Sequence, residues 1–142
     1  MKTIRKFPTF SLLAVISALV FATASRGAAG DNDQRGVLFG TVSIPAGLSK
    51  SEVQNDIVKV LSGREWDIKA KDDASVVGYL KHRSNEATVT LVYDSASVEI
   101  YCVGWSIDKH TGERKEPQLP KGWLKYIRAD LIRIFNKAAA QR

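Results

Sequence analysis

The sequence predicts an α+β fold in which an antiparallel β-meander carries two amphipathic helices on one face. Four consecutive segments alternate apolar and polar residues and are separated by short turn sequences, which is typical of neighbouring antiparallel strands. Two other segments repeat their apolar residues with the period of a helix, and one alternating segment precedes both. The expected order is therefore β-α-β-β-β-β-α, with both helices on the same face of the sheet.

The first strand is expected over residues 36–44, where the alternation is weak and a Pro-Ala-Gly sequence follows. In the second strand, Trp66, Ile68 and Ala70 share the side predicted to face the core. The last strand becomes apolar on both sides near Trp105, so we expect both faces of that end to be covered, with the C-terminal helix as a candidate cover. The second to fifth strands are expected over 66–71, 76–83, 87–93 and 98–107.

A helix is expected over residues 50–62. Ser49 and Glu52 form a capping box, in which each side chain accepts the backbone N–H of the other residue. Gly63 supplies a C-terminal stop. The apolar residues fall on one helical stripe, which is predicted to face the core: Val53, Ile57, Val60 and Leu61.

The C-terminal part of the chain is predicted to be a loop followed by a helix. Residues 108–120 are polar and contain Gly112, Pro117 and Pro120, so we expect a flexible loop. A second amphipathic helix is expected over about 121–139. Its predicted buried positions are Trp123, Ile127, Leu131, Ile134, Phe135 and Ala138.

The N-terminus has the three regions of a secretory signal peptide, which we place at residues 1–24. Its apolar run spans about 13 residues, whereas a helix that crosses a bilayer needs roughly 20. Cleavage is expected after Ala24, and a cut after Ala29 is the alternative. The basic and cleavage residues are Lys2, Arg5, Lys6 and Ala22-Thr23-Ala24.

We therefore expect an exported chain, located in the periplasm or secreted, with no transmembrane segment after cleavage. A flexible leader is expected at 25–35 and a single α+β domain at 36–142. Without the three basic residues of the signal peptide, 18 Lys and Arg stand against 15 acidic residues, a net charge of +3. The excess is concentrated in the C-terminal helix region, where Asp130 is the only acid among these basic residues: Lys121, Lys125, Arg128, Arg133, Lys137 and Arg142.

The sequence contains one cysteine, Cys102, which cannot form an internal disulfide. We expect it to be a small buried hydrophobic residue, and the alternatives are a reactive thiol or an intermolecular disulfide. A pair of Cys102 with His82 on adjacent strands is the conceivable nucleophile and base. His110 is the other histidine and lies in the polar loop.

No pattern indicates a catalytic, cofactor or metal site. Zinc-type spacing and Gly-rich phosphate loops are absent from the sequence, and the acidic runs at 31–33 and 72–73 lack calcium-loop spacing. The acids near strand ends that could form a carboxylate pair are Asp94, Glu99 and Asp108. An alternative to a core role for the aromatic residues is a ligand groove with Arg83 or Lys125 at its rim, lined by Trp66, Tyr79, Tyr93, Tyr101, Trp105, Trp123 and Tyr126.

Five segments of the chain resemble a family of small secreted proteins and lipoproteins of proteobacteria whose function is unknown. They are IPAGLS at 44–49, GREWDI at 63–68, VVGYLKHR at 76–83, ATVTLVYD at 87–94 and WLKYIRADL at 123–131. The chain departs from that family at Glu65, where the family has mostly Gly, and at 120–122, where Pro-Lys-Gly replaces a His/Asn/Tyr-rich approach. The resemblance implies a hairpin-rich α+β domain in the cell envelope. It implies no activity and no catalytic residues.

These observations favour a non-enzymatic envelope protein that acts as a binding or interaction module. Its expected partner is another envelope protein or an anionic surface, contacted through the basic C-terminal helix, and nucleic acid is not expected. A second hypothesis is a small hydrolase or thiol-dependent enzyme that uses Cys102 and His82. A third is a self-associating structural subunit that assembles through a free sheet face or the Cys102 thiol.

Overall fold

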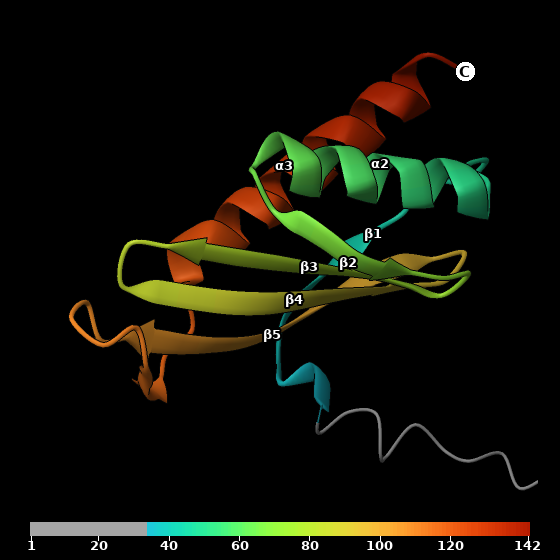
Figure 1. Ribbon diagram of the computed structural model, residues 1–142. Coiled ribbons are helices and arrows are strands. Elements are labelled where there is room, and N and C mark those ends of the chain that lie inside the picture. Colours follow the sequence, from blue (N-terminus) through green and yellow to red (C-terminus); the bar gives the residue numbers. More distant parts are fainter. Residues whose placement is uncertain (1–33) are drawn as a thin grey trace, which may run out of the picture.

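Two helices cover one face of a six-stranded antiparallel sheet in the computed structural model, which describes residues 34–142 (Figure 1). The predicted α+β class and the placement of both helices on one face are confirmed. The predicted signal peptide and most of the predicted leader lie outside the described residues. The elements are β1 (Val37–Ser43), α2 (Lys50–Gly63), β2 (Asp67–Lys71), β3 (Ser75–His82), β4 (Asn85–Tyr93), β5 (Ser97–Ile107), β6 (Arg114–Pro117) and α3 (Lys121–Ala140).

The sheet is largely a meander. Strands β2 to β5 pair in sequence order. Strand β1 pairs with the other edge of β5, which gives the order β1-β5-β4-β3-β2. Strand β6 also pairs with β5, so β1 and β6 share one edge of that strand. Gly104 lies between the two pairings. A Cβ there would come within 2.2 Å of the Gln118 carbonyl oxygen, so glycine is required for the chain to pass β5 on its way to α3.

The segment 108–120, expected to be a flexible loop, contains β6, so the expected order lacked one strand. The Asp108 carboxylate first accepts the backbone N–H groups of His110 and Thr111 and forms a turn. The chain then returns along β5, where Arg114 lies opposite Ile107. Strand β6 has the sequence Arg-Lys-Glu-Pro and is exposed throughout. It therefore shows none of the apolar alternation from which strands are predicted.

The core lies between the helices and the sheet. The predicted stripe of α2 is fully confirmed as buried. In α3 the buried stripe is rotated from the prediction: Leu124 is buried, while Trp123, Ile134 and Ala138 are only half-buried. These three residues lie on the flank of α3 that faces α2. The buried positions of the two helices are Val53, Ile57, Val60, Leu61, Leu124, Ile127, Leu131 and Phe135.

The two ends of α2 differ in how well the sequence predicted them. The capping box is confirmed, with the Glu52 N–H donating to Ser49 Oγ over 3.2 Å and the Ser49 N–H donating to Glu52 Oε2 over 2.7 Å. Gly63 is not the stop, because it is the last helical residue. The left-handed residue is Glu65, with φ of +64°. The Trp66 N–H donates to the Leu61 carbonyl over 3.0 Å, which completes a Schellman turn at a position where glycine is favoured by about 1 kcal/mol.

The side of the sheet opposite the helices is named here the outer face. A Cβ at Gly78 would contact Leu61 of α2, so Tyr79, the next residue on β3, points away from the helices. Trp105 lies on this outer face, where it contacts Arg114 of β6 rather than α3, so α3 is not the cover expected for that end of β5. The predicted core position of Ala70 is also wrong. A register shift between Ile68 and Ala70 leaves Ala70 exposed.

Candidate functional site

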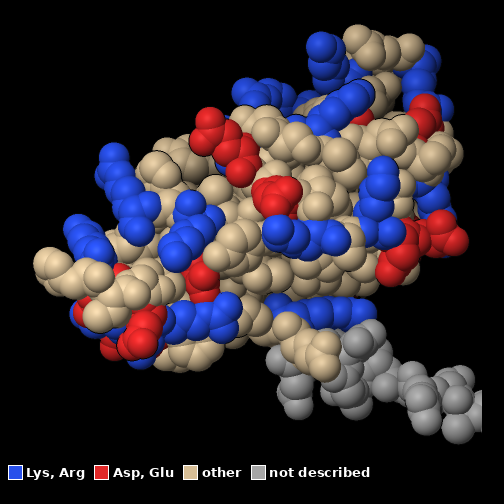
Figure 2. Space-filling view, viewed as in Figure 1, with Lys and Arg blue, Asp and Glu red and all other residues tan. Residues whose placement is uncertain are grey.

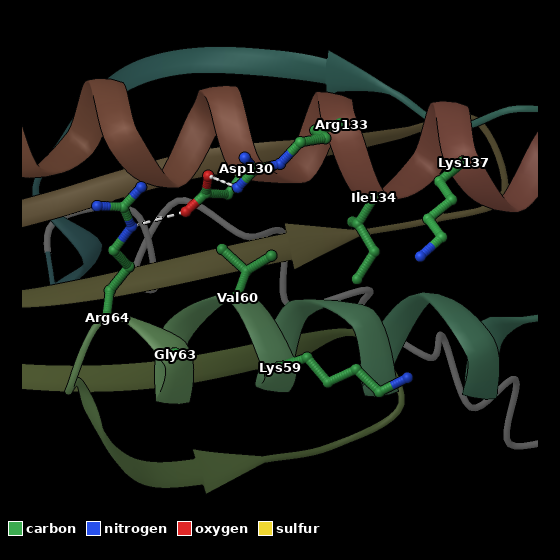
Figure 3. Close-up of a pocket in the computed structure, with 8 residues that line it drawn as sticks. All are labelled: Lys59, Val60, Gly63, Arg64, Asp130, Arg133, Ile134 and Lys137. Carbon is green, nitrogen blue, oxygen red and sulfur yellow. Dashed lines mark hydrogen bonds and ion pairs between the residues drawn. The ribbon is translucent and has the colours of Figure 1, made fainter.

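A hollow of about 490 Å³ lies between the facing flanks of α2 and α3, and is named here the helix groove (Figure 3). Its lining residues recur every three or four positions on each helix, so each helix presents one continuous flank to the groove. Val60 and Ile134 extend toward each other between the helices and form an apolar floor. The complete lining is Lys59, Val60, Gly63, Arg64, Asp130, Arg133, Ile134 and Lys137.

The helix groove contains four cationic side chains and a single carboxylate, that of Asp130. Arg64 Nε donates to one Asp130 oxygen over 2.7 Å, and Arg133 Nη2 donates to the other over 2.5 Å. The hydrogen bond from Arg64 is the main reason that the pKa of Asp130 lies below its usual range, so this carboxylate is ionised at neutral pH. One negative charge is therefore fixed among four positive ones.

Two lysines account for most of the unbalanced charge. Lys137 extends from α3 toward α2 across the groove and forms no ion pair within residues 34–142 (Figure 3). Lys59 has only a long contact with Asp56, at 3.8 Å. Figure 2 shows the same imbalance at larger scale, because most charged side chains around the C-terminal end of α3 are Lys or Arg.

A second hollow, of about 240 Å³, adjoins the helix groove and is named here the aromatic pocket. The Trp66 and Trp123 rings meet edge to face with centroids 6.0 Å apart. Arg64 belongs to both hollows, and its guanidinium lies 4.7 Å from the centroid of the Tyr126 ring. The lining of the aromatic pocket is Arg64, Glu65, Trp66, Leu80, His82, Trp123 and Tyr126.

A third hollow adjoins the other end of the helix groove and shares Lys59 with it. Its charges are balanced, because Arg142 Nη2 donates to both oxygens of Glu52 over 2.7 and 2.8 Å. This pair ties the end of the chain to the start of α2. It also removes Arg142 from the predicted set of basic residues available to a ligand.

The outer face of the sheet carries a separate charged cluster. Glu86 is buried, and its carboxylate accepts hydrogen bonds from Tyr79 Oη over 2.8 Å and from Arg114 Nε. The Arg114 guanidinium lies 5.4 Å from the Trp105 ring centroid, and Lys69 Nζ lies 5.6 Å from that of Tyr79. Every charge in this cluster has a partner, which indicates a structural role in holding β6 to the sheet.

The structure does not bring Cys102 and His82 together. Cys102 pairs with Val89, which pairs in turn with Gly78, whereas His82 lies four residues further along β3. That offset alone is roughly 13 Å. Cys102 is 1% exposed, and burial raises the pKa of its thiol to about 12, so it is neither a thiolate nor accessible to a second chain.

The acids near strand ends are also dispersed. Asp94 and Asp108 flank opposite ends of β5, and each accepts two backbone N–H groups of its own turn. Glu99 accepts a hydrogen bond from Tyr101 Oη over 2.7 Å. Within residues 34–142 no group of three or more His, Cys, Asp or Glu side chains is arranged to hold a metal ion. The acidic run at 31–33 lies outside the described residues.

Sequence reasoning identified parts of the candidate site. It identified the basic C-terminal helix, which contributes Arg133 and Lys137, and three of the seven aromatic residues proposed for a groove do meet in the aromatic pocket. It missed Lys59 and Arg64, because no periodicity within one helix reveals which flank a second helix will face. In the part of the chain that the structure describes, neither helix combines the length and apolar character needed to cross a bilayer.

Comparison of the chain with protein-family models, with curated proteins and with solved structures finds no match. The resemblance to small envelope proteins of proteobacteria therefore stays a prediction.

Proposed function

We propose that this chain is an exported, non-enzymatic binding module that holds an anionic ligand in the helix groove. The observation that carries the proposal is the charge imbalance between α2 and α3, where four cations and one carboxylate line the groove. Like charges held on two facing helices repel one another, and an anion between them relieves that repulsion. The export of the chain rests on the signal peptide predicted at residues 1–24.

The size and chemistry of the helix groove suit a small molecule. Its volume of about 490 Å³ falls within the range of ligand sites, roughly 300 to 1,000 Å³. The apolar floor formed by Val60 and Ile134 offers a ligand a nonpolar surface between the helices. Arg64 and Arg133 each keep further N–H donors beyond those bound to Asp130, and guanidinium donors match phosphate and carboxylate oxygens.

A binding role is favoured over catalysis by the state of the nucleophile. The Cys102 thiol is buried and protonated, and the register separates it from His82. The groove itself contains Arg, Lys and one ionised Asp, which suit recognition of an anion and offer no nucleophile paired with a base.

The proposal is tested by titration calorimetry with inorganic triphosphate. We expect micromolar to millimolar binding that weakens as salt is raised from 20 to 500 mM, on the basis that salt screens exposed charges over about 10 Å at 0.1 M. The double variant Lys59→Glu/Lys137→Glu should lose at least tenfold in affinity. The matched control is Lys121→Glu/Lys125→Glu, which reverses two charges of the same sign outside the groove lining and should change affinity less than threefold.

A steric variant separates the groove from general surface charge. A Cβ at Gly63 would meet no atom within 4 Å, and Gly63 lines the groove, so Gly63→Leu should occupy part of the groove without altering any charge. We expect it to reduce triphosphate affinity about tenfold. Equal loss in both charge-reversal variants, or full affinity in Gly63→Leu, would show that the anion binds elsewhere and would refute the proposal.

A further inference from the structure

The aromatic pocket is lined by Glu65, a residue whose backbone conformation favours glycine. Glu65 occupies the left-handed position of the turn that ends α2, a conformation that glycine adopts without steric cost. Its carboxylate has no hydrogen bond or ion pair within residues 34–142, although it lines the pocket. A residue in a strained backbone conformation whose exposed carboxylate lines a hollow points to a role in binding.

The lining of the pocket has two kinds of surface. Trp123, Tyr126 and Leu80 provide aromatic and apolar area, while Trp66 is only 4% exposed and supports the Trp123 ring from the core. The polar groups of Arg64, Glu65 and His82 stand around this area. An aromatic wall with several hydrogen-bonding groups at its edge matches a sugar ring, whose C–H face packs on aromatic side chains while its hydroxyls donate and accept hydrogen bonds.

The two hollows differ in charge, so each would hold a different part of one ligand. The Glu65 carboxylate repels an anion from the aromatic pocket but accepts hydrogen bonds from neutral hydroxyls. The helix groove, on the other side of Arg64, attracts the anion instead. Because Arg64 lines both hollows, a ligand that fills them has an uncharged ring directly joined to an anionic group.

We propose that the aromatic pocket binds one sugar ring through Glu65, so that the ligand of the helix groove is a sugar that carries an anionic group. This inference rests on the proposed anion-binding function and names its ligand class. Two sources share this chemistry, a free sugar phosphate and an acidic glycan, and the experiment distinguishes them.

The experiment compares each anionic sugar with a plain anion of similar charge, in a chain that carries Trp105→Phe. Trp105 lies on the outer face of the sheet, so the remaining tryptophans, Trp66 and Trp123, report on the pocket. The pairs are glucose 6-phosphate with inorganic phosphate, and a galacturonate trimer with tricarballylate. We expect the sugar of at least one pair to bind at least tenfold more tightly than its plain anion and to change the fluorescence, and the successful pair identifies the source.

The variant Glu65→Gly removes the carboxylate without threatening the fold, because glycine suits the left-handed position. It should reduce the advantage of the sugar to threefold or less and should not weaken the binding of plain anions. Arg83→Gly is the matched control, since Arg83 is also a left-handed residue, with φ of +56°, and does not line the pocket.

Three results would overturn the inference. If plain anions bind but neither sugar has an advantage, the sugar proposal fails and the anion groove stands. If Glu65→Gly keeps the full advantage, the ring is not held by Glu65. If neither the plain anions, inorganic triphosphate among them, nor the sugars bind, both this inference and the proposed function fail.

Discussion

The helix groove and the outer face of the sheet both gather charged side chains, but the charges are balanced on the outer face and unbalanced in the groove. On the outer face, the buried Glu86 carboxylate is matched by Arg114 and a tyrosine hydroxyl. In the groove, Asp130 pairs with Arg64 and Arg133, and Lys137 has no ion pair among the described residues. The contrast teaches that the balanced charges of this chain hold its fold together, whereas the unbalanced charges of the groove are the basis of the proposed anion site.

The largest expected effect is on the stability contributed by the Glu86 cluster of the outer face. Glu86→Ala leaves the Tyr79 hydroxyl and Arg114 without their shared partner, and should lower the free energy of unfolding by about 2 kcal/mol. Glu99→Ala is the control, because Glu99 also accepts a tyrosine hydroxyl on this sheet but is only half-buried, and it should cost less than about 0.5 kcal/mol. Urea unfolding measures both. Equal losses would mean that the Glu86 cluster does not stabilise β6 as described.

Acid should weaken both regions. Burial acts to raise the pKa of Glu86, but hydrogen bonds from Tyr79 and Arg114 hold it below the usual range, and the hydrogen bond from Arg64 does the same for Asp130. A carboxyl group whose pKa is lower in the folded chain stabilises the fold above its unfolded pKa, and this contribution is lost as the pH falls through the folded pKa. We therefore expect stability to fall as the pH drops below about 4.

Urea unfolding between pH 3 and 7 measures this loss. Glu86→Gln and Asp130→Asn should each show a shallower decline than the parent chain, because each lacks one of the carboxylates that must be protonated. A variant that declines as steeply as the parent would show that its carboxylate does not contribute.

A smaller effect should come from removing the charge of Asp130. This carboxylate competes with a ligand for Arg64 and Arg133, so Asp130→Asn should tighten triphosphate binding about fivefold, on the order of 1 kcal/mol. Calorimetry measures the change, and Glu86→Gln serves as the control that removes a negative charge from the other face. Weaker binding in Asp130→Asn would mean that Asp130 positions the arginines for the ligand rather than competing with it.

The smallest effect concerns backbone conformation. Glu65→Gly and Arg83→Gly should each raise the free energy of unfolding by about 0.5 to 1 kcal/mol, because both side chains occupy left-handed positions. Thermal unfolding measures the gain. A loss of stability in Glu65→Gly would show that the side chain stabilises the turn, and that its presence needs no functional explanation.

The sequence predicted the elements of the fold better than their relations in space. The capping box of Ser49 and Glu52 and the stripe of α2 were correct, because both depend on spacing within a few residues. Strand β6 was missed since only its pairing with β5 makes it a strand. The C-terminal stop of α2 was assigned to Gly63, because glycine is preferred there, whereas the helix includes Gly63 and the left-handed residue is Glu65.

The candidate site was predictable only in part for the same reason. The basic composition of the C-terminal helix was visible, but whether each cation is paired depends on the packing of α2 against α3. Arg142 is neutralised by Glu52, which lies 90 residues earlier in the chain, while Lys137 stays unpaired among the described residues. Trp123 and Ile134 satisfied the helical period expected of core residues, yet they line hollows at the edge of that core.

The position of Cys102 has a consequence for how long the protein survives. The thiol lies at the centre of the sheet and the chain has no second cysteine, so oxidation can join it only to another molecule. An exported chain is expected to work in an oxidising compartment. When the sheet opens far enough to expose Cys102 on β5, its thiol can form a disulfide with a second chain or with a small thiol. The modified chain cannot refold, because the buried site has no room for the added group. The working lifetime of the molecule then depends on how often the sheet opens: it follows the fraction of open molecules when reclosing is faster than oxidation, and the opening rate when oxidation is faster.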